Sequence, residues 1–155
     1  MAKNEEGGTK VLALNRKAWH NYSFDETFEC GISLVGTEVK SMKDNQFSFA
    51  DAYARVDKDE LWLIAFHINP YMFGNRNNHD PDQKRRLLVH KKEIRRLRRI
   101  TEEKGLTLVP LKFYLKRGFV KLELGVGRGK KLFDKREDIK KKDLRREVQR
   151  EHRIK

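Results

Sequence analysis

The sequence predicts a mainly β protein with short helices, in which a small antiparallel sheet, one longer basic helix and a basic tail share one chain. Three observations predict this class. Apolar and polar residues alternate along several stretches between residues 11 and 132, as they do in half-buried strands. A helix start signal opens a basic stretch at 81–104. After residue 133 the chain has no Gly or Pro and few apolar residues. We therefore expect a flexible lead at 1–9, a folded domain at 10–133 and a tail at 134–155.

The chain is strongly basic: its 155 residues include 36 Lys and Arg against 23 Asp and Glu, a formal charge of +13. This balance favours a polyanionic partner over a small neutral ligand. Cys30 is the only cysteine, which excludes an intramolecular disulfide and fits a reducing cytosol. No apolar run approaches the roughly 18 residues of a membrane helix, and residues 1–8 lack the apolar core of a signal peptide. We expect a cytoplasmic monomer with no cofactor and no membrane contact.

The first expected elements are a short strand at Val11–Leu14 and a connection at 15–22. The connection interleaves basic or titratable groups with the aromatic rings of Trp19 and Tyr22. One interpretation is a plain strand-to-strand connection in which both rings are half-buried. The other is an RNA-contacting segment that offers cations such as Lys17 and an aromatic surface, and the two are compatible.

A long half-buried strand is predicted at Tyr22–Val35. Its alternation places five residues on the inner face: Phe24, Phe28, Cys30, Ile32 and Leu34. Glu26 interrupts that face. Gly31 lies in the middle of the strand, where a glycine often marks a bulge or a sharp bend, and we expect one of the two there.

The middle of the chain predicts a short helix, a hairpin and a loop. Apolar residues at i,i+3 spacing indicate one or two helical turns at 36–43. Alternation returns at 47–56 and 61–68, which we expect to be two strands joined by the polar turn 57–60. Residues 69–79 have no periodicity and contain Pro and Gly, so they are predicted to cross the surface as a loop.

The longer helix is predicted at 81–104, with a break near His90. Asp80 can cap the helix, Pro81 suits its first position, and Gly105 is a favoured residue just past its end. Most of its many Lys and Arg residues lie off the apolar stripe.

A second hairpin is predicted from 106–115 and 119–126 about the turn 116–118. The residues expected to face inward are Val109, Leu111, Phe113, Leu115, Val120, Leu122, Leu124 and Val126. Short antiparallel strands with an interior glycine and one intervening helix suggest a small barrel of the OB type, which commonly binds oligonucleotides on its exposed strand face.

Residues 125–136 are expected to form a hinge between the folded domain and the tail. Glycines at alternate positions give the backbone freedom and allow another surface to approach closely. Phe133 offers a ring for stacking on a base. The cations that could contact phosphates beside it are Arg128, Lys130, Lys131 and Lys135.

The tail at 134–155 alternates blocks of charge and has too few apolar residues to dock stably. Its Lys, Arg and Glu content favours a helix once something supports it. We expect a tail that is disordered in the free protein and helical on its target. Its basic blocks are Lys140, Lys141, Lys142, Arg145 and Arg146.

A series of motifs resembles the small protein B family, the tmRNA-binding (SsrA-binding) proteins of bacterial ribosome rescue. The resemblance covers nearly the whole chain in the family's order and spacing. The motifs are Asn15–Ala18, Phe28–Ile32, Gly36–Ser41, Asn78–Pro81, Lys104–Leu111 and Gly129–Arg136.

The resemblance implies an OB-type barrel that binds the tRNA-like domain of tmRNA and supports its delivery, with elongation factor Tu, to a ribosome stalled on an mRNA without a stop codon. It further implies that the body fills the space of an anticodon arm. The basic tail would enter the decoding centre and the empty mRNA channel, so that trans-translation resumes on the reading frame of tmRNA.

Position by position, the resemblance implies two sets of residues. The tmRNA-facing set is Asn15, Glu29, Leu88 and Lys121, to which the connection adds Lys17 and Trp19. The ribosome-facing set is Gly129, Lys130, Lys131, Phe133, Asp134, Lys135 and Arg136, to which the hinge adds Arg128. The sequence leaves open whether Leu88 is a core residue and whether Glu29 is simply a solvated carboxylate. Trp19 stands where the family commonly has a basic residue, and Cys30 where it usually has Ala.

Two other classes of function remain as alternatives. A metal-dependent nuclease is disfavoured because the acidic candidates lie in a capping motif and a tail, and the five histidines lack metal-ligand spacing. We therefore expect no enzyme activity. A ribosomal-type protein or general single-stranded RNA chaperone would share the charge, barrel and tail, and only the motif series argues against it.

Overall fold

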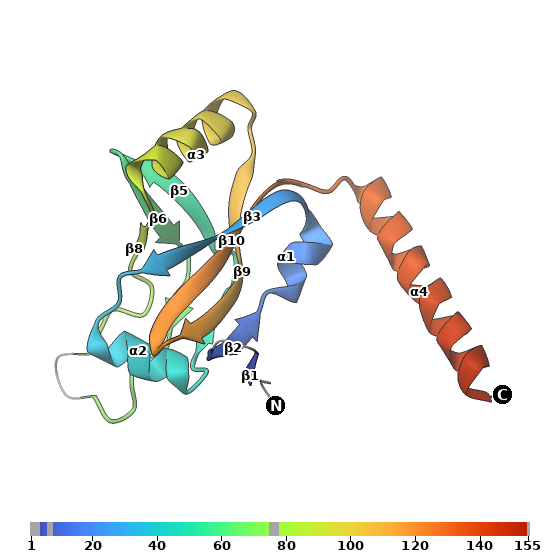
Figure 1. Ribbon diagram of the computed structural model, residues 1–155, viewed down its shortest axis with the longest axis horizontal. Coiled ribbons are helices and arrows are strands. Elements are labelled where there is room, and N and C mark those ends of the chain that lie inside the picture. Colours follow the sequence, from blue (N-terminus) through green and yellow to red (C-terminus); the bar gives the residue numbers. More distant parts are fainter. Residues whose placement is uncertain (1–3, 6–7, 75–77, 155) are drawn as a thin grey trace.

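Two long strands form the centre of the fold. β3 (Tyr22–Ile32) and β10 (Phe119–Gly129) pair antiparallel along most of their length, and β9 (Thr107–Lys116) pairs with the other edge of β10. The computed structural model (Figure 1) describes residues 4, 5, 8–74 and 78–154. Side chains at 4, 5, 132–134 and 152–154 lie outside the description.

The described strands continue from this centre in both directions. Beyond β9 lie β2 (Thr9–Leu14) and β1 (Asn4–Glu5). Beyond β3 lie β8 (Arg85–Leu88), β6 (Glu60–Ile64) and β5 (Tyr53–Asp57). Because β5 also pairs with β9, through Ala54 and Leu108, the antiparallel strands from β9 to β5 form a ring.

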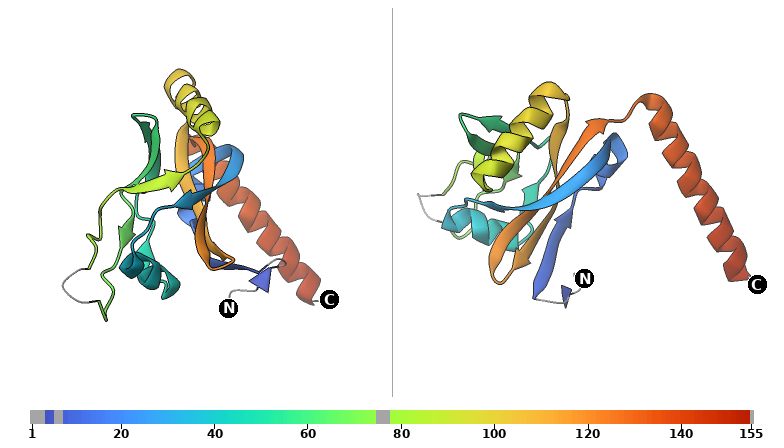
Figure 2. Two further views of the ribbon diagram at one scale, coloured as in Figure 1. Left: turned by 60° about the vertical axis from the view of Figure 1, so that its left-hand side comes forward. Right: turned by 45° about the horizontal axis from the view of Figure 1, so that its top comes forward.

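Helices lie around this ring and beyond it. α1 (Arg16–Asn21), α2 (Gly36–Lys43) and α3 (Lys91–Glu103) belong to the body, whereas α4 (Leu132–Ile154) extends away from it (Figures 1 and 2). Among the described residues, no helix combines the length and apolar content needed to cross a bilayer.

The main core fills the ring. Phe66 and Phe113 stack at its centre with ring centroids 4.8 Å apart, and both are fully buried. Leucines from β6 and β10 surround them. A smaller apolar cluster beneath α1 consists of Ala18, Val109 and Leu111.

The strongest patterns in the sequence are confirmed. The strand from Tyr22, the short helix at 36–43 and the hairpin of β9 and β10 all form, and the inner residues of β10 are buried as expected. On β9, however, a register shift turns Val109 and Leu111 towards the small cluster, while Phe113 faces the main core.

The connection at 15–22 consists mainly of the short helix α1. Asn15 caps it: its Oδ1 accepts from the backbone N–H of Ala18 at 3.2 Å. Its Nδ2 donates to the carbonyl of Pro110 at 2.8 Å, and this bond holds α1 against β9.

The two strands predicted at 47–56 and 61–68 are each interrupted. Ala50 and Ala65 adopt left-handed backbone angles, with φ of 45° and 60°, which a continuing strand cannot accommodate. The result is β5 and β6 in the main sheet, with β4 (Phe47–Ser48) and β7 (His67–Ile68) paired separately.

The prediction of a helix over 81–104 is wrong in its first part. Asp80 accepts from the N–H of Asp82 at 3.0 Å and so forms a turn instead of a cap. Residues 85–88 then form β8, which pairs with β3 and β6, and the helix begins only after His90. Arg85 holds this strand in place through long-range contacts that a sequence pattern does not reveal.

Arg85 forms a buried ion pair with Glu38 of α2, with Nε and Oε2 2.6 Å apart and both side chains at most 2% exposed. The guanidinium also donates to the carbonyl oxygens of Phe66, Asp80 and Pro81. His79 lies nearby, bonded to Thr37 at 2.8 Å and to the carbonyl of Ile68 at 3.0 Å. The motif at 78–81 therefore has a structural role, because its hydrogen bonds hold neighbouring loops in place.

Of the bulge or bend predicted at Gly31, the bulge is absent, since β3 and β10 are paired without interruption there. The register shift lies instead beside Gly127. A Cβ on Gly127 would lie 2.1 Å from the carbonyl oxygen of Ser23, so this glycine allows β10 to approach β3 closely.

The hinge is shorter than predicted, because Gly125, Gly127 and Gly129 all belong to β10 and the first two are buried. Only Lys130 and Lys131 separate β10 from α4. The tail is helical throughout its described backbone. Its disorder in the free protein stays a prediction.

Candidate nucleic-acid interface

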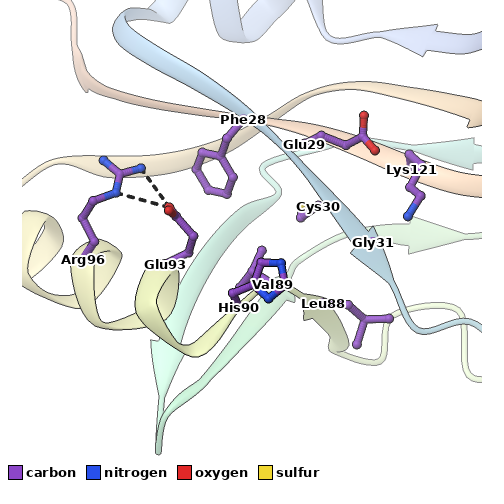
Figure 3. A pocket seen from close by; sticks show the side chains of 10 residues that line it. All are labelled: Phe28, Glu29, Cys30, Gly31, Leu88, Val89, His90, Glu93, Arg96 and Lys121. Carbon is purple, nitrogen blue, oxygen red and sulfur yellow. Dashed lines mark hydrogen bonds and ion pairs between the residues drawn. The ribbon is translucent and has the colours of Figure 1, made fainter.

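A groove of about 550 Å³ lies where β3 meets β10 on one side and the junction of β8 and α3 on the other. Its lining includes Glu29, Leu88 and Lys121, three of the residues predicted to face tmRNA (Figure 3). They come from three different strands, so the fold brings together residues that are 33 or more positions apart in sequence.

Strand register explains how they meet. Gly31 of β3 is the partner of Leu88 on β8 and of Lys121 on β10, so the three residues form one row across the sheet. A Cβ on Gly31 would lie 3.3 Å from the Cβ of Leu88, tighter than ordinary van der Waals contact. The glycine therefore forms the open floor between an apolar side chain and a cationic one.

Leu88 is 51% exposed, which excludes the core role that the sequence left open. Lys121 is half-buried on the opposite side of the row. An exposed leucine beside a lysine can pack on the face of a sugar or base while the ammonium contacts a phosphate.

Glu29 is held as a carboxylate at the end of the groove. Its pKa is lowered, first by a hydrogen bond from the Tyr114 hydroxyl and then by Lys116, whose Nζ lies 3.4 Å from Oε2. The carboxylate is exposed, so it can accept a hydrogen bond from a base or a 2′-hydroxyl.

Sequence reasoning missed Tyr114 and Lys116 as neighbours of Glu29. Burial and the contact with Glu29 raise the pKa of the Tyr114 hydroxyl, which therefore remains a donor. Tyr114 lies opposite Lys121 in the β9–β10 register. The alternation of β9 could have placed Tyr114 on the outer face, but only the strand pairing brings it to Glu29.

α3 completes the far wall. Arg96 donates to Glu93 of the same helix at 3.1 and 3.2 Å and to Glu26 of β3 at 2.6 Å. The pair with Glu26 explains the charged residue on the inner face of β3, since that carboxylate meets a guanidinium rather than the core.

The α1 residues of the predicted tmRNA set lie apart from this groove. The polar groups of Asn15 are already bonded within the protein, and its side chain is buried. Lys17 is exposed, with its Nζ 3.7 Å from Asp51. Trp19 is 50% exposed and rests edge-on against Phe24, with centroids 5.0 Å apart.

A second recess of about 420 Å³ adjoins α1 and the start of α4. Its lining includes Lys17 of the predicted tmRNA set and Lys130 and Lys135 of the predicted ribosome set. Residues of the two sets therefore meet in this recess. Lys130 contacts the carboxylate of Asp138 and donates from Nζ to the carbonyl of Trp19 at 3.2 Å. This ion pair with Lys130 lowers the pKa of Asp138 and ties the first turns of α4 to the body.

The remaining residues predicted to face the ribosome begin at the junction of β10 and α4, residues 128–131. Arg128, Gly129, Lys131 and Arg136 are exposed. The side chains of Phe133 and Asp134 lie outside the described residues. The basic residues of the tail are all exposed along α4: Lys140, Lys141, Lys142, Arg145 and Arg146. Within the described part of the chain, no cluster of His, Cys, Asp or Glu is suited to hold a metal ion.

Comparison with known proteins identifies the family. The family model described as SmpB protein matches residues 12–154. The SsrA-binding protein of Treponema denticola is 51% identical over 150 residues, covering 97% of both chains. The SsrA-binding protein of Bacillus subtilis is 51% identical over 145 residues, covering 94% of this chain and 93% of that protein.

A solved structure agrees with these matches. A chain in the structure described as "tmRNA-SmpB: a journey to the center of the bacterial ribosome" is 50% identical and superposes with a TM-score of 0.65, covering 79% of this chain and 85% of that chain. Similarity of sequence and structure along most of the chain leads to one conclusion. The chain belongs to the SmpB family.

Proposed function

We propose that this protein binds tmRNA and acts with it on stalled ribosomes in trans-translation. The observation that carries this proposal is the groove in which Glu29, Leu88 and Lys121 meet, in a chain of the SmpB family. Its relatives are SsrA-binding proteins, and the similar solved structure concerns tmRNA and the ribosome. The role is one of binding and delivery, not of catalysis.

The groove receives part of the tRNA-like domain. Lys121 contacts a phosphate, Leu88 packs on a ribose or base, and Glu29 accepts a hydrogen bond from a base or 2′-hydroxyl. Lys17 and Trp19 extend the contact with a cation and an exposed ring. Asn15 acts indirectly, because its bonds to Ala18 and Pro110 position α1.

Residues 128–131, at the junction of β10 and α4, face the ribosome together with α4 itself. Arg128, Lys130, Lys131, Lys135 and Arg136 contact ribosomal RNA at the decoding centre, where Phe133 stacks on an exposed base. The 23 residues of α4 span about 34 Å at about 1.5 Å per residue, enough to carry its cations along the empty mRNA channel. The helix forms fully only on that target, since most of its residues are charged and its few apolar residues, such as Leu144, are exposed.

The ring of strands supports an OB-type barrel as the scaffold of both surfaces. The protein acts as a monomer in the cytoplasm and meets elongation factor Tu through aminoacylated tmRNA. The groove binds tmRNA and the cation-rich tail binds the ribosome, which explains why one chain has both.

The identity of the RNA tests this proposal. Tagged full-length protein and a truncation after Arg136 are recovered gently from native cytosol, and the associated RNA is sequenced. We expect tmRNA to dominate both samples and ribosomal RNA to be lost with the tail. A broad mixture of transcripts without tmRNA enrichment would instead establish a general RNA chaperone.

A further inference from the structure

The outer face of α3 carries exposed cations to which the proposed function gives no role. They are Lys91, Lys92, Arg95 and Arg99. None of the four forms an ion pair with a described carboxylate, whereas Arg96 pairs with Glu26 and Glu93, and Arg98 with Asp59 at 2.7 Å.

These cations are concentrated opposite the buried face. At about 100° per residue, Lys91, Arg95, Arg99 and Lys92 fall within one 100° sector, and the direction of buried Ile94 and Leu97 lies on the other side of the helix. The paired arginines flank this sector. From Lys91 to Arg99 the stripe is about 12 Å long, eight residues at about 1.5 Å each.

This arrangement opposes the stability of the helix. Lys91, Arg95 and Arg99 follow one another at i,i+4, where like charges repel. The first turn contains Lys91 and Lys92 beside Glu93, and the last contains Glu102 and Glu103 with no cation, so the helix macrodipole opposes most of these charges. Exposed cations that repel one another and lack carboxylate partners among the described residues point to a role in binding.

We propose that this stripe binds the phosphate backbone of a double-helical arm of tmRNA next to the segment held in the groove. This inference rests on the proposed function. All the exposed residues of α3 are charged, so the face suits backbone contacts rather than reading of bases. Over about 12 Å, a nucleic-acid duplex presents on the order of seven charges.

tmRNA rather than the ribosome is assigned because α3 itself forms one wall of the groove. His90, Glu93 and Arg96 line it with Glu29 and Lys121, as Figure 3 shows. The junction and α4, which the proposed function assigns to the ribosome, leave the body from the end of β10 (Figure 1). RNA leaving the groove across α3 meets the stripe directly.

Two matched variants test the proposal. The first combines Lys91→Gln, Arg95→Gln and Arg99→Gln. The control combines Lys10→Gln, Lys40→Gln and Lys43→Gln, which removes the same charge from exposed positions outside α3. Binding to the isolated tRNA-like domain is measured between about 50 and 200 mM salt, with excess tRNA present.

We expect the α3 variant to bind roughly ten-fold more weakly, and its log–log salt slope to fall by about 2 to 3, because three phosphate contacts are lost. The control should change affinity by less than about three-fold. Loss of like-charge repulsion should leave the thermal midpoint of the α3 variant unchanged or raised, so weak binding cannot be attributed to unfolding.

Other outcomes overturn the inference in different ways. If the two variants match in affinity and slope, the stripe does not bind the tRNA-like domain. If the α3 variant binds the tRNA-like domain normally but ribosomes weakly, the assignment to tmRNA is wrong. If unmodified protein shows no preference for the tRNA-like domain over tRNA, the proposed function itself fails and the inference falls with it.

Discussion

Gly31 and Leu88 are partners across β3 and β8, and the glycine's missing side chain leaves the floor of the groove open beneath the leucine. This one pairing decides the shape of the surface on which Lys121 and Glu29 also lie. It also gives a role to a glycine that the sequence pattern placed at a bulge or a sharp bend.

Gly31→Ala should weaken binding of the tRNA-like domain by about five-fold, roughly 1 kcal/mol, because Leu88 must move to admit the new methyl group. Gly36→Ala is the control, since a Cβ there meets nothing within 4 Å. Equilibrium binding measures both. Equal affinities of the two variants would show that the groove floor does not contact RNA.

Gly127→Ala should destabilise the protein by about 2 kcal/mol or more, because its Cβ would collide with the β3 backbone at Ser23. Gly129→Ala should be nearly neutral, since a Cβ there has open space. Urea unfolding distinguishes the two. If Gly127→Ala left the free energy of unfolding unchanged, β10 would not be packed closely against β3 at this position.

Glu38→Gln should cost about 3 to 5 kcal/mol of unfolding free energy, because it leaves the buried Arg85 charge without its partner. Asp59→Asn breaks the exposed pair with Arg98 and should cost less than about 1 kcal/mol. Asn tolerates the left-handed backbone of position 59. Similar losses in the two variants would contradict the structural role of the buried pair.

Tyr114→Phe should raise the pKa of Glu29 towards its ordinary value of 4.5, because the hydroxyl donor is the largest cause of its lowering. The lowered pKa stabilises the fold above pH 4.5, and this contribution is lost as the pH falls through the folded-state pKa. The difference in unfolding free energy between the unmodified protein and Tyr114→Phe should therefore be largest above pH 4.5 and shrink below it. An NMR titration of the Glu29 carboxyl that is unchanged in the variant would refute the contact.

The sequence predicts well whatever depends on local periodicity. The long alternation of β3, the hairpin of β9 and β10, and the outward direction of Glu29 and Lys121 follow from residue spacing alone. The basic charge of the tail is equally visible in composition.

The rest depends on partners that are distant in sequence. β8 replaces a predicted helix because Arg85 meets Glu38, 47 positions away, and because two strands are available to pair with it. Gly127 is a packing residue only because Ser23 lies against it. The link from Tyr114 to Glu29 needs the register of three strands, which no single stretch of sequence encodes.

The groove formed by Glu29, Gly31, Leu88 and Lys121 is the proposed site of selective tmRNA binding. The most direct test is equilibrium binding of the isolated tRNA-like domain in excess tRNA, with unmodified protein, Lys121→Glu and the control Lys10→Glu. We predict tight binding by unmodified protein and the control, and a loss of about ten-fold or more for Lys121→Glu. Equal binding by all three proteins would show that the groove is not the tmRNA-binding surface.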